Sequence, residues 1–241
     1  MRFRGDHGVI VSLALSSHPL PSAAMTIVLT AAAALSGRSG TECLLVAATI
    51  VSGQLTVGWV NDVVDRQRDR QVGRTDKPLA TGRIDPRTVI FAVACAGLLV
   101  IALSMANGIT AGVAHLLAVA SAWLYNFWFK RTALSWLPYA LSFGLLPAFL
   151  SYGGLVGAPD SVTGGPPTWA MTVLAALLGI GIHFLNALPD LDEDRATGVR
   201  HLPLRLAERV GAPGLLRFAR AYTLVAGAAL IAAALGVGLR Q

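Results

Sequence analysis

Two short stretches of this sequence combine an asparagine with two aspartates at intervals of four residues. They read NDVVDRQRD over 61–69 and NALPDLDED over 186–194, and each follows an apolar run. The six residues are Asn61, Asp65, Asp69, Asn186, Asp190 and Asp194. On a helix of roughly 3.6 residues per turn, this spacing puts the three side chains of each stretch along one stripe. Carboxylates four residues apart repel each other, and a cation between them reverses that cost. Because no His or Cys occupies a matching position, the oxygen-only donor set favours a hard ion such as Mg²⁺.

The composition predicts that these stretches lie at the ends of membrane-spanning helices. Charged residues make up 13% of the 241 residues and hydrophobic residues 54%, with a mean hydropathy of +0.62. Soluble domains carry about 25% charged residues, and a bilayer-spanning helix needs roughly 20 apolar residues. The segments that meet this requirement are 19–37, 42–60, 88–106, 109–129, 134–153, 168–188 and 214–237. We therefore expect an all-α polytopic membrane protein, a bundle of about seven transmembrane helices in a single domain over residues 1–241.

The two acidic stretches also belong to an internal repeat. At an offset of 125 residues, seven of the 19 residues in 61–79 are identical to their counterparts in 186–204. Four predicted spans separate the two copies, so the chain returns to the same side of the membrane in the same orientation. The sequence predicts two parallel pseudo-repeats, over about 19–129 and 134–237, with both acidic motifs facing one central cavity.

The distribution of charge predicts the orientation of the bundle. The formal net charge is +6, and 17 of the 19 Lys and Arg residues fall on one side of the predicted spans, as the positive-inside rule requires of the cytoplasmic side. Eleven of the 13 acidic residues share that side, which the rule does not require. We expect an integral protein of the cell inner membrane, with a cytoplasmic N-terminus and cytoplasmic acidic motifs, in contact with membrane lipid and not with nucleic acid. The N-terminal stretch is expected to form an uncleaved interfacial helix rather than a signal peptide.

A single acidic stretch has two interpretations: a solvated cytoplasmic turn with compensating charges, or part of a binding site. Two copies at a fixed offset, each ending an apolar span, favour the binding site, because polar groups at membrane helix ends are commonly functional. Mg²⁺ typically takes one or two carboxylates together with substrate phosphates. Two acidic clusters flanked by arginines therefore suit a diphosphate held between metal ions, with guanidinium groups on the remaining oxygens.

Taken together, these residues resemble the motifs of the UbiA-type intramembrane prenyltransferases. The first motif of that family has the form N-x-x-x-D-x-x-x-D after the second span, and the second, D-x-x-x-D, follows the sixth. RTDKPLATG (74–82) resembles the family's basic-Pro-small-Gly continuation, and YNFWFKR (125–131) resembles its tyrosine-to-lysine stretch. The resemblance covers about residues 15–210. It implies Mg²⁺-dependent transfer of a prenyl group from a prenyl diphosphate to a lipophilic acceptor, an aromatic compound or quinone precursor.

The resemblance also implies a role for each matching residue. The ligands of the Mg²⁺–diphosphate would be Asp65, Asp69, Asp190, Asp194 and Asn61. The residues in contact with the substrate would be Asn61, Asn186, Arg74 and Lys130, with Arg131 as the alternative to Lys130. Arg74 and Lys130 would act on the diphosphate, and Tyr125 would lie near the reacting allylic carbon.

The sequence departs from the family pattern in three places. The family usually has nine spans where we draw seven, so oligomerisation or lipid is expected to supply the missing wall, or activity to be lost. His18 precedes Pro19 where the family often has an arginine, and it is either a polar interface residue or a substrate contact. The interval from Tyr125 to the lysine is one residue longer than in the family.

The remaining polar residues are weaker candidates for a functional role. Pro189 should kink or end its helix, so that the second motif sits on a new turn. His115 and His183 are expected to be packing residues, and His201 is a minor candidate for a phosphate contact. The expected solvated neighbours of the ligands are Asp62, Asp192 and Glu193.

Two other functions stay open at the level of the sequence. A membrane terpene cyclase would use the same diphosphate site and need no acceptor. A transporter or other cation-binding membrane protein can also be built from parallel repeats. Its sites usually lie at mid-membrane, however, whereas the acidic residues here lie at span ends.

Overall fold

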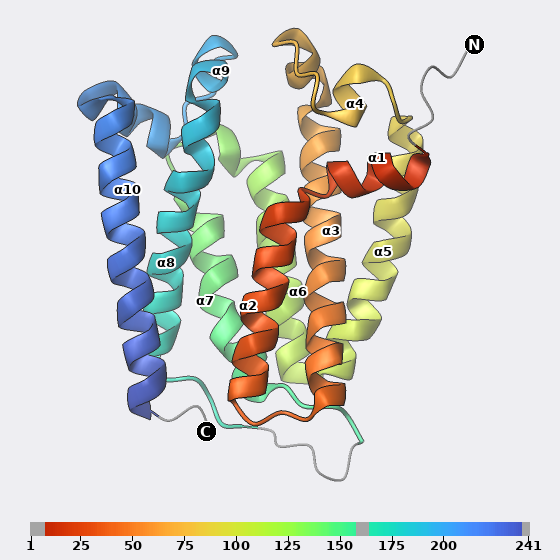
Figure 1. Ribbon diagram of the computed structural model, residues 1–241, viewed down its shortest axis with the longest axis vertical. Helices are drawn as coiled ribbons and strands as arrows, with labels where there is room; N and C mark the ends of the chain where they lie inside the picture. The colour runs from red at the N-terminus through yellow and green to blue at the C-terminus, as the bar shows by residue number, and fades with distance from the viewer. Residues whose placement is uncertain (1–7, 158–163, 238–241) are drawn as a thin grey trace.

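The computed structural model describes residues 8–157 and 164–237, and every regular element within these ranges is a helix (Figure 1). The long helices are α2 (Pro19–Leu35), α3 (Gly40–Gln71), α5 (Pro86–Ala106), α6 (Ile109–Phe127), α7 (Trp136–Tyr152), α8 (Trp169–Ala187) and α10 (Leu202–Val237). The short elements are α1 (Val9–Ser16), α4 (Pro78–Thr81), α9 (Leu191–Ala196) and the 3-10 turns η1 (Phe129–Arg131) and η2 (Leu188–Asp190). Each predicted span corresponds to one long helix, so the all-α fold is confirmed.

Most of the long helices have the length and composition to cross a bilayer. Among the described residues five do so, namely α3, α5, α6, α8 with α9, and α10. Helices α1 and α2 pass the same test as a pair but are bent by 67°, so α1 leaves the direction of the bundle, as an interfacial helix would. Helix α7 is shorter, with 17 residues, and packs between α6 and α8. The number of crossings and the two parallel pseudo-repeats stay predictions.

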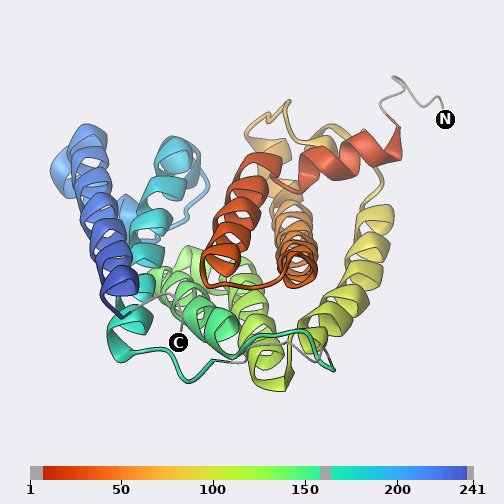
Figure 2. The same ribbon diagram turned by 60° about the horizontal axis from the view of Figure 1, so that its bottom comes forward.

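The long helices form an up-and-down bundle (Figures 1 and 2). Packing runs from α2 through α3 and α5 to α6 and α7, and then to α8 and α10. The short helices α1, α4 and α9 and the C-terminal end of α3 lie toward the upper end of the bundle in Figure 1. Both segments that carry an acidic motif therefore lie at the same end of the molecule.

Helix α3 is longer than the predicted span, and its extra length carries the first acidic motif. The helix begins with a capping box, in which Ser39 and Glu42 satisfy each other's backbone N–H groups. It continues without a break beyond residue 60 because residues 61–71 contain no Gly or Pro. The first motif therefore lies within the helix rather than just beyond its end.

The second motif lies on a break in the helix. Helix α8 ends at Ala187, η2 covers the next three residues, and α9 begins at Leu191. Pro189 has no N–H with which to continue the ladder of α8, so the predicted change to a new turn is confirmed. Asp190 lies in η2 and Asp194 in α9, where the positive end of the short helix favours carboxylates.

Two apolar clusters hold the motif-bearing ends in place. Trp59 of α3 packs in one of them with Leu79 of α4. Phe184 of α8, Leu191 of α9 and Leu204 of α10 pack in the other. All five side chains are buried, and full burial of an apolar side chain contributes about 1.5–3 kcal/mol. The loop after α3 and helix α9 are thus anchored beneath their charged residues.

Gly58 allows α3 to approach the corner between α1 and α2 closely. A Cβ at this position would lie 2.6 Å from the backbone carbonyl of Ser17. His18, which follows Ser17, is the N-cap of α2 and has a left-handed conformation with a φ of 52°. The absence of a side chain at Gly58 therefore brings His18 within reach of α3.

Replacement of Gly58 by alanine should destabilise the protein by about 1–3 kcal/mol, because the new methyl group collides with backbone that cannot move aside easily. Thermal unfolding of the detergent-solubilised protein would measure the change. Gly97→Ala on α5 is the matched control, since a Cβ there meets nothing within 4 Å. Equal melting temperatures for the two variants would contradict this account of the α1–α2 corner.

Candidate active site

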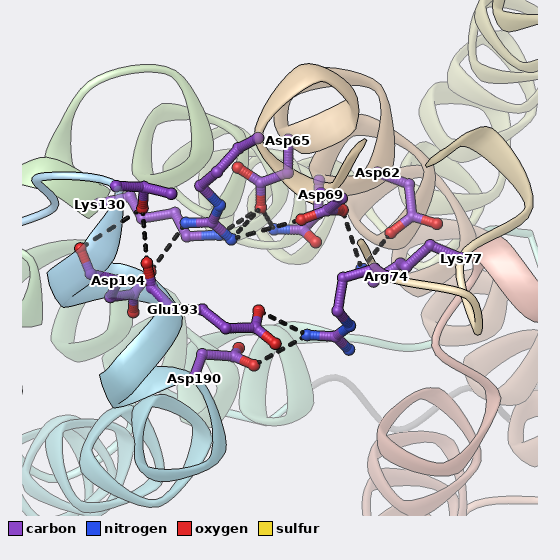
Figure 3. A network of polar contacts seen from close by, with 12 residues as sticks. Asp62, Asp65, Asp69, Arg74, Lys77, Lys130, Asp190, Glu193 and Asp194 are labelled. Carbon is purple, nitrogen blue, oxygen red and sulfur yellow. Dashed lines mark hydrogen bonds and ion pairs between the residues drawn. The ribbon is translucent and has the colours of Figure 1, made fainter. Parts of the chain in front are cut away.

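The two acidic motifs meet at one end of the bundle (Figure 3). Asp65 and Asp69 project from the last turns of α3, and Asp190 and Asp194 from η2 and α9. The Arg68 guanidinium joins the two motifs. Its Nη1 donates to Asp194 Oδ1 at 2.8 Å, and its Nη2 lies 3.3 Å from Asp65 Oδ2 and 3.8 Å from Asp69 Oδ1. The structure thus brings together carboxylates that are 125 residues apart in the sequence.

Asp65 has partners from two further segments. Its Oδ2 accepts from the Lys130 ammonium group of η1 and from Asn61 Nδ2, the latter at 3.2 Å. The same amide nitrogen donates to Asn126 Oδ1 of α6 at 2.8 Å. These contacts tie the end of α6 to the first motif and bury Asp65 almost completely.

Asp194 has protein partners on both carboxylate oxygens. Oδ1 accepts from Arg68, and Oδ2 lies 2.7 Å from His201 Nε2. His201 Nδ1 accepts the backbone N–H of Leu204 at 3.0 Å, so the proton of the neutral ring lies on Nε2 and is donated to Asp194. His201 therefore positions a carboxylate rather than facing open solvent.

Arg74 links the loop after α3 to the second motif. Its Nη1 lies 3.1 Å from Asp190 Oδ1 and 3.0 Å from Glu193 Oε2. Its Nε and Nη2 donate to the two carboxylate oxygens of Asp76, each at 2.9 Å. These hydrogen bonds lower the pKa of Asp76 to about 2 and raise the pKa of Arg74. Because the Asp76 side chain is 62% exposed, the pair contributes little to stability.

A second buried cluster adjoins this network. Asp62 is only 1% exposed, and its Oδ1 is bound by Lys77 Nζ and lies 3.0 Å from His18 Nε2. Lys77 Nζ also lies 3.9 Å from Asp69 Oδ2, which connects the two clusters. The second oxygen of Asp62 is buried without a hydrogen-bond partner in the described part of the chain.

Aromatic rings adjoin the charged residues. Tyr125 of α6 contacts the rings of Tyr139 and His183, with centroid distances of 5.0 Å and 5.6 Å. Tyr139 Oη accepts from Asn186 Nδ2 at 3.3 Å. Tyr125 directly precedes Asn126, which is bonded to the first motif. An apolar, aromatic region therefore borders the carboxylates.

The structure gathers seven of the ten predicted site residues in one polar network, and three lie outside it: Tyr125, which contacts the neighbouring rings, Arg131 and Asn186. The polar network includes Asn61, Asp65, Asp69, Arg74, Lys130, Asp190 and Asp194. Arg131 is exposed and forms no hydrogen bond or ion pair within residues 8–157 and 164–237, so Lys130 is the cation that reaches the first motif. Asn186 contacts Tyr139 instead of the aspartates.

Some expectations for neighbouring residues were wrong. Asp62 was expected to be solvated, yet it is buried. Glu193 is partly solvated, with its side chain 31% exposed, but it also forms an unexpected ion pair with Arg74. The reason is that each meets a basic residue from another segment, which the local sequence does not reveal. Asp192, with its side chain 97% exposed, is solvated as expected.

The histidines divide between packing and positioning roles. His115 Nδ1 bonds to Ser104 Oγ at 2.8 Å, and His183 Nε2 bonds to Ser135 Oγ at 2.9 Å. Both are buried, in agreement with the expectation that they pack within the bundle. His18, for which two interpretations were open, is a polar partner of Asp62.

Two cations of the network, Arg68 and Lys77, were missed by sequence reasoning. Arg68 lies three residues after Asp65 and directly before Asp69, so helical spacing alone identifies it as a neighbour of Asp65. Lys77 lies within the RTDKPL segment that marked the basic continuation of the first motif. Its contact with Asp62 depends on the fold of the loop, and the sequence carries no signal for it.

The donor set suits a divalent cation in its chemistry, since it consists of carboxylate and amide oxygens. Asp65 and Asp194 both contact one guanidinium group, so one cationic centre already bridges the two motifs. Within the described residues, however, no three His, Cys, Asp or Glu side chains are grouped closely enough to hold a metal ion. The side chains of Arg68 and Lys130 occupy carboxylate oxygens that an ion would need.

Comparison with known proteins assigns the chain to a family. The model of the UbiA prenyltransferase family matches residues 22–240, so this chain belongs to that family. Together with the long apolar helices, this makes it an integral membrane protein. In fold it is similar to a UbiA homolog from Archaeoglobus fulgidus solved bound to GPP and Mg²⁺, with a TM-score of 0.72, 17% identity, and coverage of 93% of this chain and 78% of that one.

The curated relatives differ in the names they carry. Digeranylgeranylglyceryl phosphate synthase of Methanothrix thermoacetophila is 31% identical over 62% of this chain and 53% of its own length. 4-Hydroxybenzoate octaprenyltransferase of Pseudomonas entomophila is 30% identical over 62% of this chain and 49% of its own length. Lycopene elongase/hydratase of Haloferax volcanii is 30% identical over 86% of this chain and 69% of its own. The chain thus spans about half the length of the first two.

The buried cluster around Asp62 gives a stability prediction. Lys77→Met should destabilise the protein by about 3 kcal/mol, because it removes a cation from a carboxylate that is 1% exposed. Arg195→Met is the control, since its partner Asp192 is exposed and surface pairs contribute about 0–1 kcal/mol. Thermal unfolding in detergent would compare the two.

Adding Asp62→Asn to Lys77→Met should recover part of the lost stability, because the remaining side chain then carries no charge. If the double variant is no more stable than Lys77→Met, the loss comes from packing of the lysine chain and the electrostatic account of this cluster is wrong.

Proposed function

We propose that this chain catalyses the Mg²⁺-dependent transfer of a prenyl group from a prenyl diphosphate to a lipophilic acceptor, an aromatic compound or quinone precursor. The observation that carries the proposal is the meeting of two acidic motifs at one end of an apolar helical bundle. Family membership supports the reaction class. The GPP and Mg²⁺ bound to the Archaeoglobus fulgidus homolog support the proposed substrate and ion.

The metal–diphosphate would be held by the carboxylates of the two motifs. The proposed ligands are Asp65, Asp69, Asp190 and Asp194, with the amide oxygen of Asn61 as a further donor. When bound, Mg²⁺ offsets the negative charge that develops on the leaving diphosphate. The buried position of Asp65 and Asp194 favours this role, because carboxylates removed from water depend on a counter-cation.

The basic residues around the motifs would bind the phosphate oxygens. Arg74 presents a planar guanidinium suited to bidentate contact with phosphate, and Lys130 presents a point charge at the other side of Asp65. Both pair with carboxylates of the motifs, which supports the proposed contact with the diphosphate. Asn186 would contact the substrate from the aromatic side.

The apolar side of the site would protect the reacting carbon. The bond between the allylic carbon and the diphosphate oxygen breaks, and the electron pair leaves with the diphosphate. The acceptor then forms a bond to this carbon and loses a proton. Tyr125, packed with Tyr139 and His183, would present an aromatic face to the allylic cation and exclude water from it.

We further propose that the site opens at the cytoplasmic side of the cell inner membrane. The support for this is the concentration of Lys and Arg on the side of the motifs. The two parallel pseudo-repeats would then each contribute one acidic motif to one cavity. Membrane lipid and a homo-oligomeric assembly are the proposed neighbours of the bundle.

Asp65→Asn should reduce prenyl transfer at least 100-fold, because it removes a carboxylate charge at the point where the two motifs meet. Membranes containing the protein would be incubated with a prenyl diphosphate and a pool of aromatic acceptors, with and without excess chelator, and products read by mass spectrometry. Asp192→Asn, at an exposed position of the second motif, is the matched control and should retain activity.

The same experiment separates the alternatives. Product formed from prenyl diphosphate without any acceptor would indicate a terpene cyclase. Turnover by Asp65→Asn equal to that of the unaltered protein, or turnover that persists in excess chelator, would refute the proposal. Ion or solute flux in liposomes without prenyl turnover would instead favour a transporter.

A further inference from the structure

Arg68 occupies the centre of the polar network. Its side chain is 10% exposed, and those of its three acidic neighbours are 3–5% exposed. It is the only side chain among the described residues that contacts carboxylates of both Asp motifs. Buried carboxylates repel each other strongly unless a cation lies between them. Arg68 supplies that cation from within the chain.

The position of Arg68 breaks the symmetry of the repeat. At the offset of 125 residues, Arg68 corresponds to Glu193. Each of the two reaches across to the other motif segment, since Arg68 binds Asp194 and Glu193 binds Arg74. A cation thus occurs in the first motif where the second has an anion. The shared N-x-x-x-D-x-x-x-D pattern does not require either residue.

The guanidinium is bound on one side only. Nη1 and Nη2 make all of its contacts with the carboxylates, whereas Nε is buried and has no hydrogen-bond partner among the described residues. An unpartnered buried donor is unfavourable, because it has lost its hydrogen bond to water without gaining another. This cost lowers the net stability of the bridge and makes Arg68 easier to displace from the carboxylates.

We propose that Arg68 is an internal counter-ion that binds Asp65 and Asp194 in the metal-free protein and that a divalent cation must displace. The inference rests on the proposed function, because it concerns the same carboxylates. In the metal-free state Arg68 holds the two motifs together against the repulsion between their carboxylates. When the ion binds, Arg68 gives up these oxygens, so Arg68 weakens the affinity of the site for the ion.

Direct metal binding tests the proposal without any turnover. Purified protein in detergent would be titrated with Mn²⁺, and free Mn²⁺ followed by electron paramagnetic resonance, with no prenyl diphosphate present. Arg68→Gln should bind Mn²⁺ about tenfold more tightly than the unaltered chain, which corresponds to about 1.4 kcal/mol. Arg68→Lys keeps the charge but lacks the fork that bridges two carboxylates, and it should show an intermediate affinity.

Arg66→Gln is the matched control. Arg66 lies on the same helix, two residues away, and forms no hydrogen bond or ion pair with the residues that the structure describes. Its replacement removes the same charge from the same end of α3. It should leave Mn²⁺ affinity within about twofold of the unaltered chain, because long-range charge alone is screened by salt.

A second measurement addresses the metal-free state. In excess chelator, Arg68→Gln should melt several degrees below Arg66→Gln, because the carboxylates lose their bridge. Saturating Mg²⁺ should remove most of this difference. The chelator and Mg²⁺ arms together separate a counter-ion role from simple misfolding, which an added ion would not reverse.

The inference is refuted if Arg68→Gln and Arg68→Lys bind Mn²⁺ no more tightly than Arg66→Gln, or if no variant binds it. Tighter binding by Arg68→Gln supports it, including the case in which only that variant binds. The proposed function is judged separately by prenyl transfer in membranes. Transfer by the unaltered chain with no gain in Mn²⁺ affinity in Arg68→Gln would leave the function standing and remove the role of Arg68.

Discussion

The need of buried carboxylates for a cation governs the active end of this protein. Asp62, Asp65, Asp69 and Asp194 are at most 4% exposed, and an isolated ionised carboxylate in such surroundings is very costly. Each is therefore bound by a basic group that comes from a different turn or a different helix. The same need for a cation suits these carboxylates to a metal site. Carboxylate oxygens that bind a basic side chain have the donor atoms that a metal ion carrying a phosphate requires.

The ends of the helices position the buried carboxylates beside their basic partners. Helix α3 runs past the apolar span without a breaking residue, so its last turns carry the first motif as a rigid stripe. Pro189 breaks the chain after α8, so the second motif turns toward the first. The apolar clusters around Leu79 and Leu191 anchor the two segments from below. The charged side chains of both motifs are thereby held in fixed positions at the end of a bundle that is otherwise stabilised by apolar helix packing.

The site has two chemically distinct parts. The charged part, with its acidic motifs and basic partners, would bind the metal and the diphosphate in the proposed function. The aromatic part, formed by Tyr125, Tyr139 and His183, would contact the prenyl group in the proposed function. Relatives whose names differ in the compound that they make all match this chain.

The sequence by itself determined the helical membrane fold, the two motifs and most of the candidate ligands, because hydropathy and helical spacing act locally. It also indicated the break at Pro189, since a proline removes a specific backbone hydrogen bond. Only the tertiary structure decided which charges pair. The bridge from Arg68 to Asp194 and the burial of Asp62 beside His18 and Lys77 join segments that are remote in the chain. Local patterns carry no information on such contacts, because a charge at a helix end is solvated or buried according to what packs against it from elsewhere.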